Sequence, residues 1–88
     1  MDFLVIDDDR IFREATCLLI EDEGHYAEGA ATPEAGLDAV REGKFDAVFL
    51  DLHLGKHNGL QFLPTILKLR PQQAIVMFSA QGTIKNAV

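Results

Sequence analysis

Carboxylates and a hydroxyl follow three separate apolar runs of this 88-residue chain. Asp7 and Asp8 come directly after the first run, Asp51 follows the third, and Ser79 follows the fourth. Carboxylates that gather in one place repel one another unless a cation neutralises them. Because a donor set made only of oxygen suits small hard cations, these residue types predict a site for Mg²⁺ or Mn²⁺.

Asp51 is the candidate nucleophile of this site. A carboxylate beside a bound cation can attack a phosphoryl group in line, while the cation and a nearby hydroxyl stabilise the equatorial oxygens. Asp51 stands alone after the most hydrophobic of the first three runs, whereas Asp7 and Asp8 are adjacent and better placed to hold a metal. The pattern therefore predicts phosphoryl chemistry at Asp51, with Ser79 as the candidate hydroxyl.

The elements that must position these residues follow from the apolar pattern, which alternates between strand-like runs and helix-like spacing. This alternation is typical of βαβ units and a parallel sheet. Strands are expected at residues 3–6, 25–31, 45–50 and 74–78, and helices at residues 10–23, 33–43 and 59–70. Ligands of such a sheet collect outside the carboxyl ends of its strands, so the carboxylates and the hydroxyl are expected to meet at that edge.

Local signals predict where the helices begin and end. Asp9 is expected to cap the first helix, and Gly24 to follow its end. Thr32 and Pro33 supply an N-cap and a first-turn proline for the second helix. Pro64 falls inside the third predicted helix, where a mild kink is expected.

The first predicted helix carries its apolar residues at helical spacing, which predicts one face that packs against the sheet. These residues are Ile11, Phe12, Ala15, Leu18 and Leu19. Cys17 lies in the same stretch and is expected to pack in the core. Because it is the single cysteine of the chain, it cannot form an internal disulfide.

Composition excludes several classes of function. The net charge is −6 and the eight Lys and Arg residues are scattered, so we expect no nucleic acid to bind through this segment. The apolar runs are far shorter than the roughly 20 residues of a membrane span, which predicts a cytoplasmic chain without a membrane anchor. His25, His53 and His57 match no common metal-ligand spacing and are expected to be solvated.

Three motifs carry a resemblance to response-regulator receiver domains. They are the opening at residues 4–9, the segment at residues 49–54 with Gly59 eight residues after Asp51, and the triplet at residues 78–80. The resemblance covers residues 1–88. It implies a flavodoxin-like (CheY-like) α/β fold, a doubly wound parallel sheet with five strands in the order 2-1-3-4-5.

The resemblance also implies roles for individual residues. Asp51 matches the phosphoacceptor, Asp8 a direct metal ligand, and Asp7 an acid that acts mostly through water. The backbone carbonyl of His53 matches the group that completes the Mg²⁺ or Mn²⁺ site.

Two further positions match the switch region of the family. Ser79 matches the hydroxyl that moves toward the phosphoryl oxygens, and Ala80 the small residue that leaves room for them.

The chain departs from the family pattern at Gly55, where a proline is usual, and this glycine is expected to make the loop more mobile. A helix starting near Gly82 stops at Val88, so we expect a receiver truncated after its fourth strand and the start of its fourth helix. The family's strand-five lysine and switch aromatic would lie beyond Val88. The fourth strand is then an exposed edge, which predicts association of the isolated chain and leaves a homodimer open.

The resemblance implies a phosphoacceptor signalling domain rather than an enzyme with an independent substrate. A histidine kinase would supply the phosphoryl group, and a downstream effector domain would respond. Residues 79–88 resemble the NtrC-like group of sigma-54-dependent regulators, which points to transcription as the output. Two alternatives stay open, a pseudo-receiver that binds partners without phosphorylation and a metal-dependent hydrolase.

Overall fold

Four parallel strands form the central sheet of the computed structural model, which describes residues 1–79. The strands lie in the order β2-β1-β3-β6. Their bounds are β1 (Asp2–Ile6), β2 (Tyr26–Ala30), β3 (Ala47–Asp51) and β6 (Ile75–Phe78). This order confirms the first four positions of the predicted 2-1-3-4-5 sheet, because β6 is the fourth strand of the parallel set. The helix expected from Gly82 lies outside the described residues.

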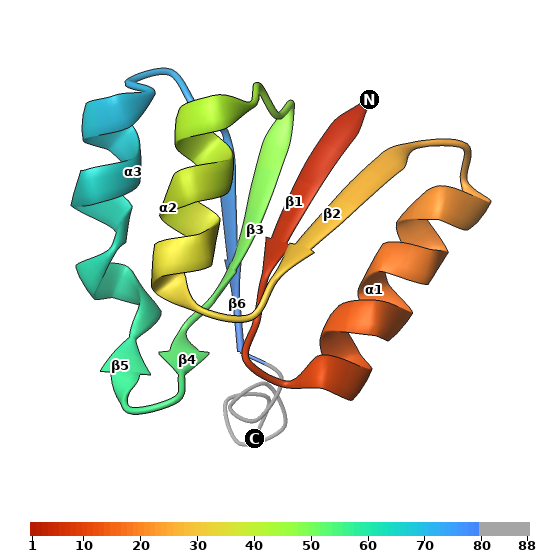
Figure 1. Cartoon of the computed structure of the whole chain (residues 1–88), viewed down its shortest axis with the longest axis horizontal. Coiled ribbons are helices and arrows are strands. Elements are labelled where there is room, and N and C mark those ends of the chain that lie inside the picture. Colours follow the sequence, from red (N-terminus) through yellow and green to blue (C-terminus); the bar gives the residue numbers. More distant parts are fainter. Residues whose placement is uncertain (80–88) are drawn as a thin grey trace, which may run out of the picture.

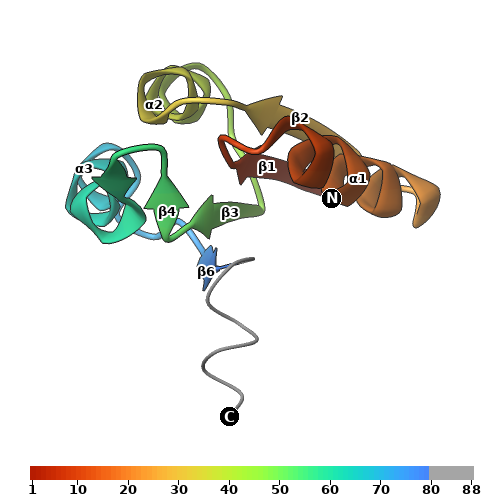
Figure 2. The same ribbon diagram turned by 90° about the horizontal axis from the view of Figure 1, so that it is seen from below.

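Helices cover both faces of this sheet (Figure 1). Helix α1 (Arg10–Asp22) lies on one face, and α2 (Pro33–Glu42) and α3 (Leu63–Leu69) lie together on the other, as Figure 2 shows from below. The doubly wound α/β arrangement is therefore confirmed. Within residues 1–79 no helix has the length and apolar character needed to cross a membrane.

The predicted caps are confirmed. The Asp9 carboxylate accepts hydrogen bonds from two first-turn amides of α1, at 3.0 and 3.2 Å. The Thr32 hydroxyl accepts one at 3.1 Å from the amide of Ala35 in α2. Gly24 takes a φ of 88° just after α1, where its N–H donates to the Glu21 carbonyl at 2.9 Å.

The main core lies between the sheet and the pair α2 and α3. Its members are all at most 5% exposed: Leu4, Ile6, Ala30, Val40, Val48, Leu50, Leu54 and Ile66. Because side chains alternate along a strand, the residues next to these on β1 and β3 point to the opposite side of the sheet, on which α1 lies. The core thus holds β1 and β3 side by side, with Ile6 in register with Leu50 just before the two acidic strand ends.

The prediction that α1 buries its apolar residues is wrong. None of its residues is buried, and Ile11, Leu18 and Leu19 are 80%, 60% and 68% exposed. The reason is that α1 packs mainly on β1 and β2 and meets β6 through the stacked rings of Phe12 and Phe78. Most of the β3 and β6 surface on that face is therefore left without a covering helix within residues 1–79. Cys17 is accordingly half-buried rather than a core residue.

The segment after β3 also differs from its prediction. In place of an irregular loop, β4 (His53–Leu54) and β5 (His57–Asn58) form a short antiparallel hairpin. The hairpin forms because Leu54 is apolar and buried, at 1% exposed, and because Gly55 allows a tight turn at a φ of 60°.

The third helix begins later than predicted. A separate 3-10 turn, η1 (Gly59–Gln61), precedes α3, which starts at Leu63 and places Pro64 in its first turn. A first-turn proline has no hydrogen bond to lose, so the expected kink within one helix is wrong.

Candidate functional site

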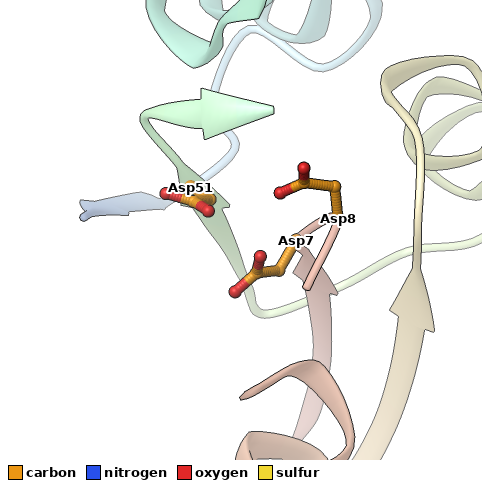
Figure 3. A group of neighbouring side chains, drawn as sticks. All are labelled: Asp7, Asp8 and Asp51. Atoms are coloured by element: carbon orange, nitrogen blue, oxygen red, sulfur yellow. The ribbon is translucent and has the colours of Figure 1, made fainter. Parts of the chain in front are cut away.

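Three carboxylates meet at the carboxyl edge of the sheet (Figure 3). Asp7 and Asp8 directly follow β1, and Asp51 is the last residue of β3, the neighbouring strand. Each can offer one oxygen so that the three atoms lie within 4.8 Å of one another. The prediction that the fold brings these acids together is confirmed.

Asp7 is fully buried. Its Oδ1 accepts a hydrogen bond from the Asp9 amide at 2.9 Å, whereas its Oδ2 is buried and has no hydrogen-bond partner in the described part of the chain. Burial raises the pKa of Asp7 to about 6, and the Asp9 N–H opposes the rise. The neighbouring Asp51 side chain, which favours the protonated form by hydrogen bonding and by its charge, and the charge of Asp8 add to it. The ionised Asp7 carboxylate is therefore buried without a positive charge to offset it among the described residues.

Within residues 1–79 no ion pair joins a basic side chain to any of the three carboxylates. The ion pairs found there, Arg10–Glu14 and Arg41–Asp38, both lie elsewhere on the surface. Arg13 does reach the site, but its Nη1 donates at 2.8 Å to the backbone carbonyl of Asp7 and not to the carboxylate. The arrangement thus combines a buried, partly unsatisfied carboxylate with two acidic neighbours, which is the donor set of a hard divalent cation.

Asp51 is 5% exposed, and its Oδ1 accepts a hydrogen bond from the His53 amide at 3.0 Å. The His53 amide therefore contacts the Asp51 carboxylate, and the His53 side chain is exposed. The backbone of Gly59 lies close to that of Asp51, and its N–H donates to the Leu52 carbonyl at 2.7 Å. A side chain at position 59 would overlap the carbonyl oxygen of Asp51, so glycine is needed for this close approach.

Asp8 is the exposed member of the trio. Its Oδ2 accepts a hydrogen bond at 2.8 Å from the amide of Gly55, which is 47 residues away in the chain. The residue type at Gly55 indicated only a mobile loop, and its contact with Asp8 was not predicted. The available signal was a glycine in a short turn after Asp51. The neighbouring sequence does not indicate which residue accepts a hydrogen bond from its N–H.

Ser79 directly follows β6 and is buried, at 7% exposed. Since Asp51 is in register with Phe78, the serine continues the strand next to the Asp51 strand end. The structure therefore brings Ser79 to the same edge of the sheet. Ala80 lies outside the described residues.

Comparison with known proteins identifies the family. A family profile described as "Response regulator receiver domain" matches residues 3–88. The DNA-binding transcriptional regulator NtrC of Azospirillum brasilense is 33% identical over 85 residues, a match that covers 97% of this chain and 18% of that protein. The chain thus spans about a fifth of the length of this relative.

Solved structures agree in fold. A response regulator from Burkholderia pseudomallei, crystallised with a phosphorylated aspartic acid, a calcium ion and citrate, has a TM-score of 0.85 and 29% identity, covering 98% of this chain and 51% of that one. A chain in the crystal structure of histidine kinase ThkA with the response regulator TrrA has a TM-score of 0.82 and 28% identity, covering 90% and 68%. Together with the acidic edge of the sheet, these matches show that the chain belongs to the response-regulator receiver domain family.

Proposed function

We propose that this receiver domain accepts a phosphoryl group on Asp51 with the help of Mg²⁺ or Mn²⁺. The observation that carries the proposal is the trio of buried Asp7, exposed Asp8 and buried Asp51, in which Oδ2 of Asp7 has no hydrogen-bond partner among residues 1–79. A cation would supply the missing partner and neutralise the repulsion. The Burkholderia relative, with its phosphorylated aspartic acid and calcium ion, supports the same chemistry here.

The three side chains are close enough to share one cation. One oxygen from each carboxylate lies within 4.8 Å of the other two, and oxygen ligands are those that Mg²⁺ prefers. We propose Asp8 and Asp51 as direct ligands, Asp7 as a ligand acting mostly through water, and the His53 carbonyl as a further ligand. When bound, the cation would stabilise the charge that develops on the phosphoryl oxygens.

Asp51 would act as the nucleophile. A carboxylate oxygen forms the new O–P bond as the P–N bond of a phosphohistidine breaks, and the electron pair of that bond returns to the imidazole nitrogen. The His53 amide supports this role because it holds Oδ1 of Asp51 in a fixed direction at 3.0 Å. The burial of Asp51 keeps competing water away from the reacting carboxylate.

We further propose that Ser79 responds to phosphorylation by donating its hydroxyl to a phosphoryl oxygen, and that Ala80 leaves room for the group. The phosphodonor would be a histidine kinase, a proposal supported by the relative found in complex with ThkA. By analogy with NtrC, an effector domain outside residues 1–88 would convert the switch into transcription control in the cytoplasm. We expect no turnover of an independent substrate.

The test is phosphorylation by acetyl phosphate in the presence of Mg²⁺, read from the intact mass. The expected result is a gain of one phosphoryl group that disappears in Asp51→Ala and when the metal is removed. Asp22→Asn is the matched control, because Asp22 is an exposed acid at the end of α1, and it should label normally. A folded chain that stays unlabelled would contradict the proposal and favour the pseudo-receiver.

A further inference from the structure

The β4–β5 hairpin lies directly beside the acidic trio. Its strands pair His53 with Asn58 and Leu54 with His57, so that Gly55 and Lys56 form a two-residue turn. Leu54 anchors the hairpin in the core at 1% exposed, while both turn residues are exposed. The buried Leu54 side chain therefore fixes the position of the exposed turn next to the site.

Gly55 adopts a conformation that few other residues tolerate. Its φ is 60°, whereas no other residue of this hairpin has a positive φ. A positive φ at the first turn position alone is the pattern of a type II′ turn, in which that position is typically glycine. Proline is excluded there because its ring holds φ near −65°.

This turn brings a backbone donor to Asp8. The Gly55 N–H donates to Oδ2 of Asp8 at 2.8 Å, a length typical of a hydrogen bond to a charged carboxylate. Asp8 is exposed, and the side-chain hydrogen bond found for its carboxylate within residues 1–79 is this one. An exposed acid next to two other carboxylates would otherwise be free to turn toward solvent.

We propose that Gly55 is a positioning residue for the cation site, because its N–H orients the Asp8 carboxylate toward Asp7 and Asp51. Cation binding then depends on the β4–β5 hairpin being formed. The inference rests on the proposed function in that Asp8 is taken as a metal ligand. A carboxylate has about four lone-pair positions, so one N–H on Oδ2 leaves Oδ1 available to a cation. Residues that orient ligands typically change metal affinity by 10–100-fold.

The hydrogen bond itself is tested without metal. In the full chain, we expect Asp8→Ala to speed hydrogen exchange of the Gly55 amide at least tenfold, because its acceptor is lost. Asp8→Asn retains an oxygen acceptor and should keep part of the protection. Unchanged exchange in Asp8→Ala would overturn the inference.

The link to the cation is tested by titration with MgCl₂ in a calorimeter. Gly55→Pro removes both the N–H and the positive φ, and we expect its Mg²⁺ affinity to fall at least tenfold. Gly55→Asn is the matched control, since it keeps the N–H and Asn is among the residues best tolerated at positive φ. Its affinity should stay within about threefold of that of the unmodified chain.

The outcomes separate the two proposals. If the unmodified chain binds no Mg²⁺, the proposed metal site fails and this inference fails with it. If the unmodified chain binds Mg²⁺ and Gly55→Pro binds it equally well, only the role of Gly55 is overturned. An equal loss in Gly55→Asn and Gly55→Pro would also overturn it, because the N–H would then not be the cause.

Discussion

At the scale of single residues, Asp7 shows how the fold changes the chemistry of a side chain. The same carboxylate that would titrate near 3.8 in an unfolded chain has its pKa raised to about 6 by burial and by the charges around it. Between pH 3.8 and about pH 6 the folded chain therefore binds more protons than the unfolded chain. The contribution of Asp7 to stability is therefore fully present below about pH 3.8 and is lost as pH rises through about 6.

We predict that the metal-free chain loses this part of its free energy of unfolding between pH 4 and pH 7. Asp7→Asn removes the titrating group, so its stability should exceed that of the unmodified chain at pH 7 by more than at pH 4.5. Urea denaturation at the two pH values, in the presence of a chelator, measures the difference. A constant difference between the two chains would show that the Asp7 pKa is not raised.

Gly59 provides the second residue-scale prediction. Any side chain at this position meets the backbone carbonyl of Asp51, which cannot move aside as a flexible side chain would. We predict that Gly59→Ala lowers the free energy of unfolding by about 3 kcal/mol. Labelling of Asp51 by acetyl phosphate should fall as well, because the clash displaces the acceptor strand end.

Gly24→Ala is the matched control for Gly59→Ala. Gly24 also has a positive φ, but a Cβ there would meet no atom within 4 Å. Only the backbone strain remains, which costs about 1 kcal/mol. Equal losses in the two variants, measured by urea denaturation, would argue against the close approach at Asp51.

At the scale of elements, Pro64 decides where α3 begins. It lies in the first turn, where the missing N–H costs nothing and the fixed φ restricts the unfolded chain. Pro64→Ala should therefore lower stability by about 0.4–1 kcal/mol, measured as a shift in the urea midpoint. A proline inside the helix would behave in the opposite way, and its replacement would raise stability. Thr65→Ala, at the next exposed position, should change stability by less than about 0.5 kcal/mol.

At the scale of the whole molecule, the uneven coverage of the sheet is the dominant feature. The α1 face retains exposed apolar side chains on the helix and on β6, and β6 is an edge of the sheet formed by residues 1–79. An uncovered apolar face next to an unpaired strand edge favours association between chains. We therefore predict concentration-dependent association of the 88-residue chain, with a homodimer as its smallest product.

Sedimentation velocity over a range of concentrations tests this prediction. Leu19→Glu combined with Val76→Lys places charges on the exposed helix face and on the edge strand, and should shift the chain toward monomer. Leu60→Glu is the control, since Leu60 is 50% exposed but lies on η1, away from that face. A monodisperse unmodified chain at all concentrations would contradict the prediction.

The amino-acid sequence by itself determined the order of strands and helices, the caps at Asp9 and Thr32, and the gathering of Asp7, Asp8 and Asp51 at one edge. These features are local, because the apolar period and the cap residues act within a few positions, and parallel strands necessarily share their carboxyl edge. The hairpin was missed because it depends on the burial of Leu54 in the folded core. The late start of α3 was missed because it depends on where Pro64 lies in the folded chain.

The tertiary structure alone decided the finer properties of the site. The Gly55–Asp8 hydrogen bond joins residues 47 positions apart, the need for glycine at 59 comes from the Asp51 backbone, and the raised pKa of Asp7 comes from its burial. The exposure of Leu19 likewise depends on which strands α1 covers. Each of these depends on distances between segments remote in sequence, which a local pattern of residue types does not encode.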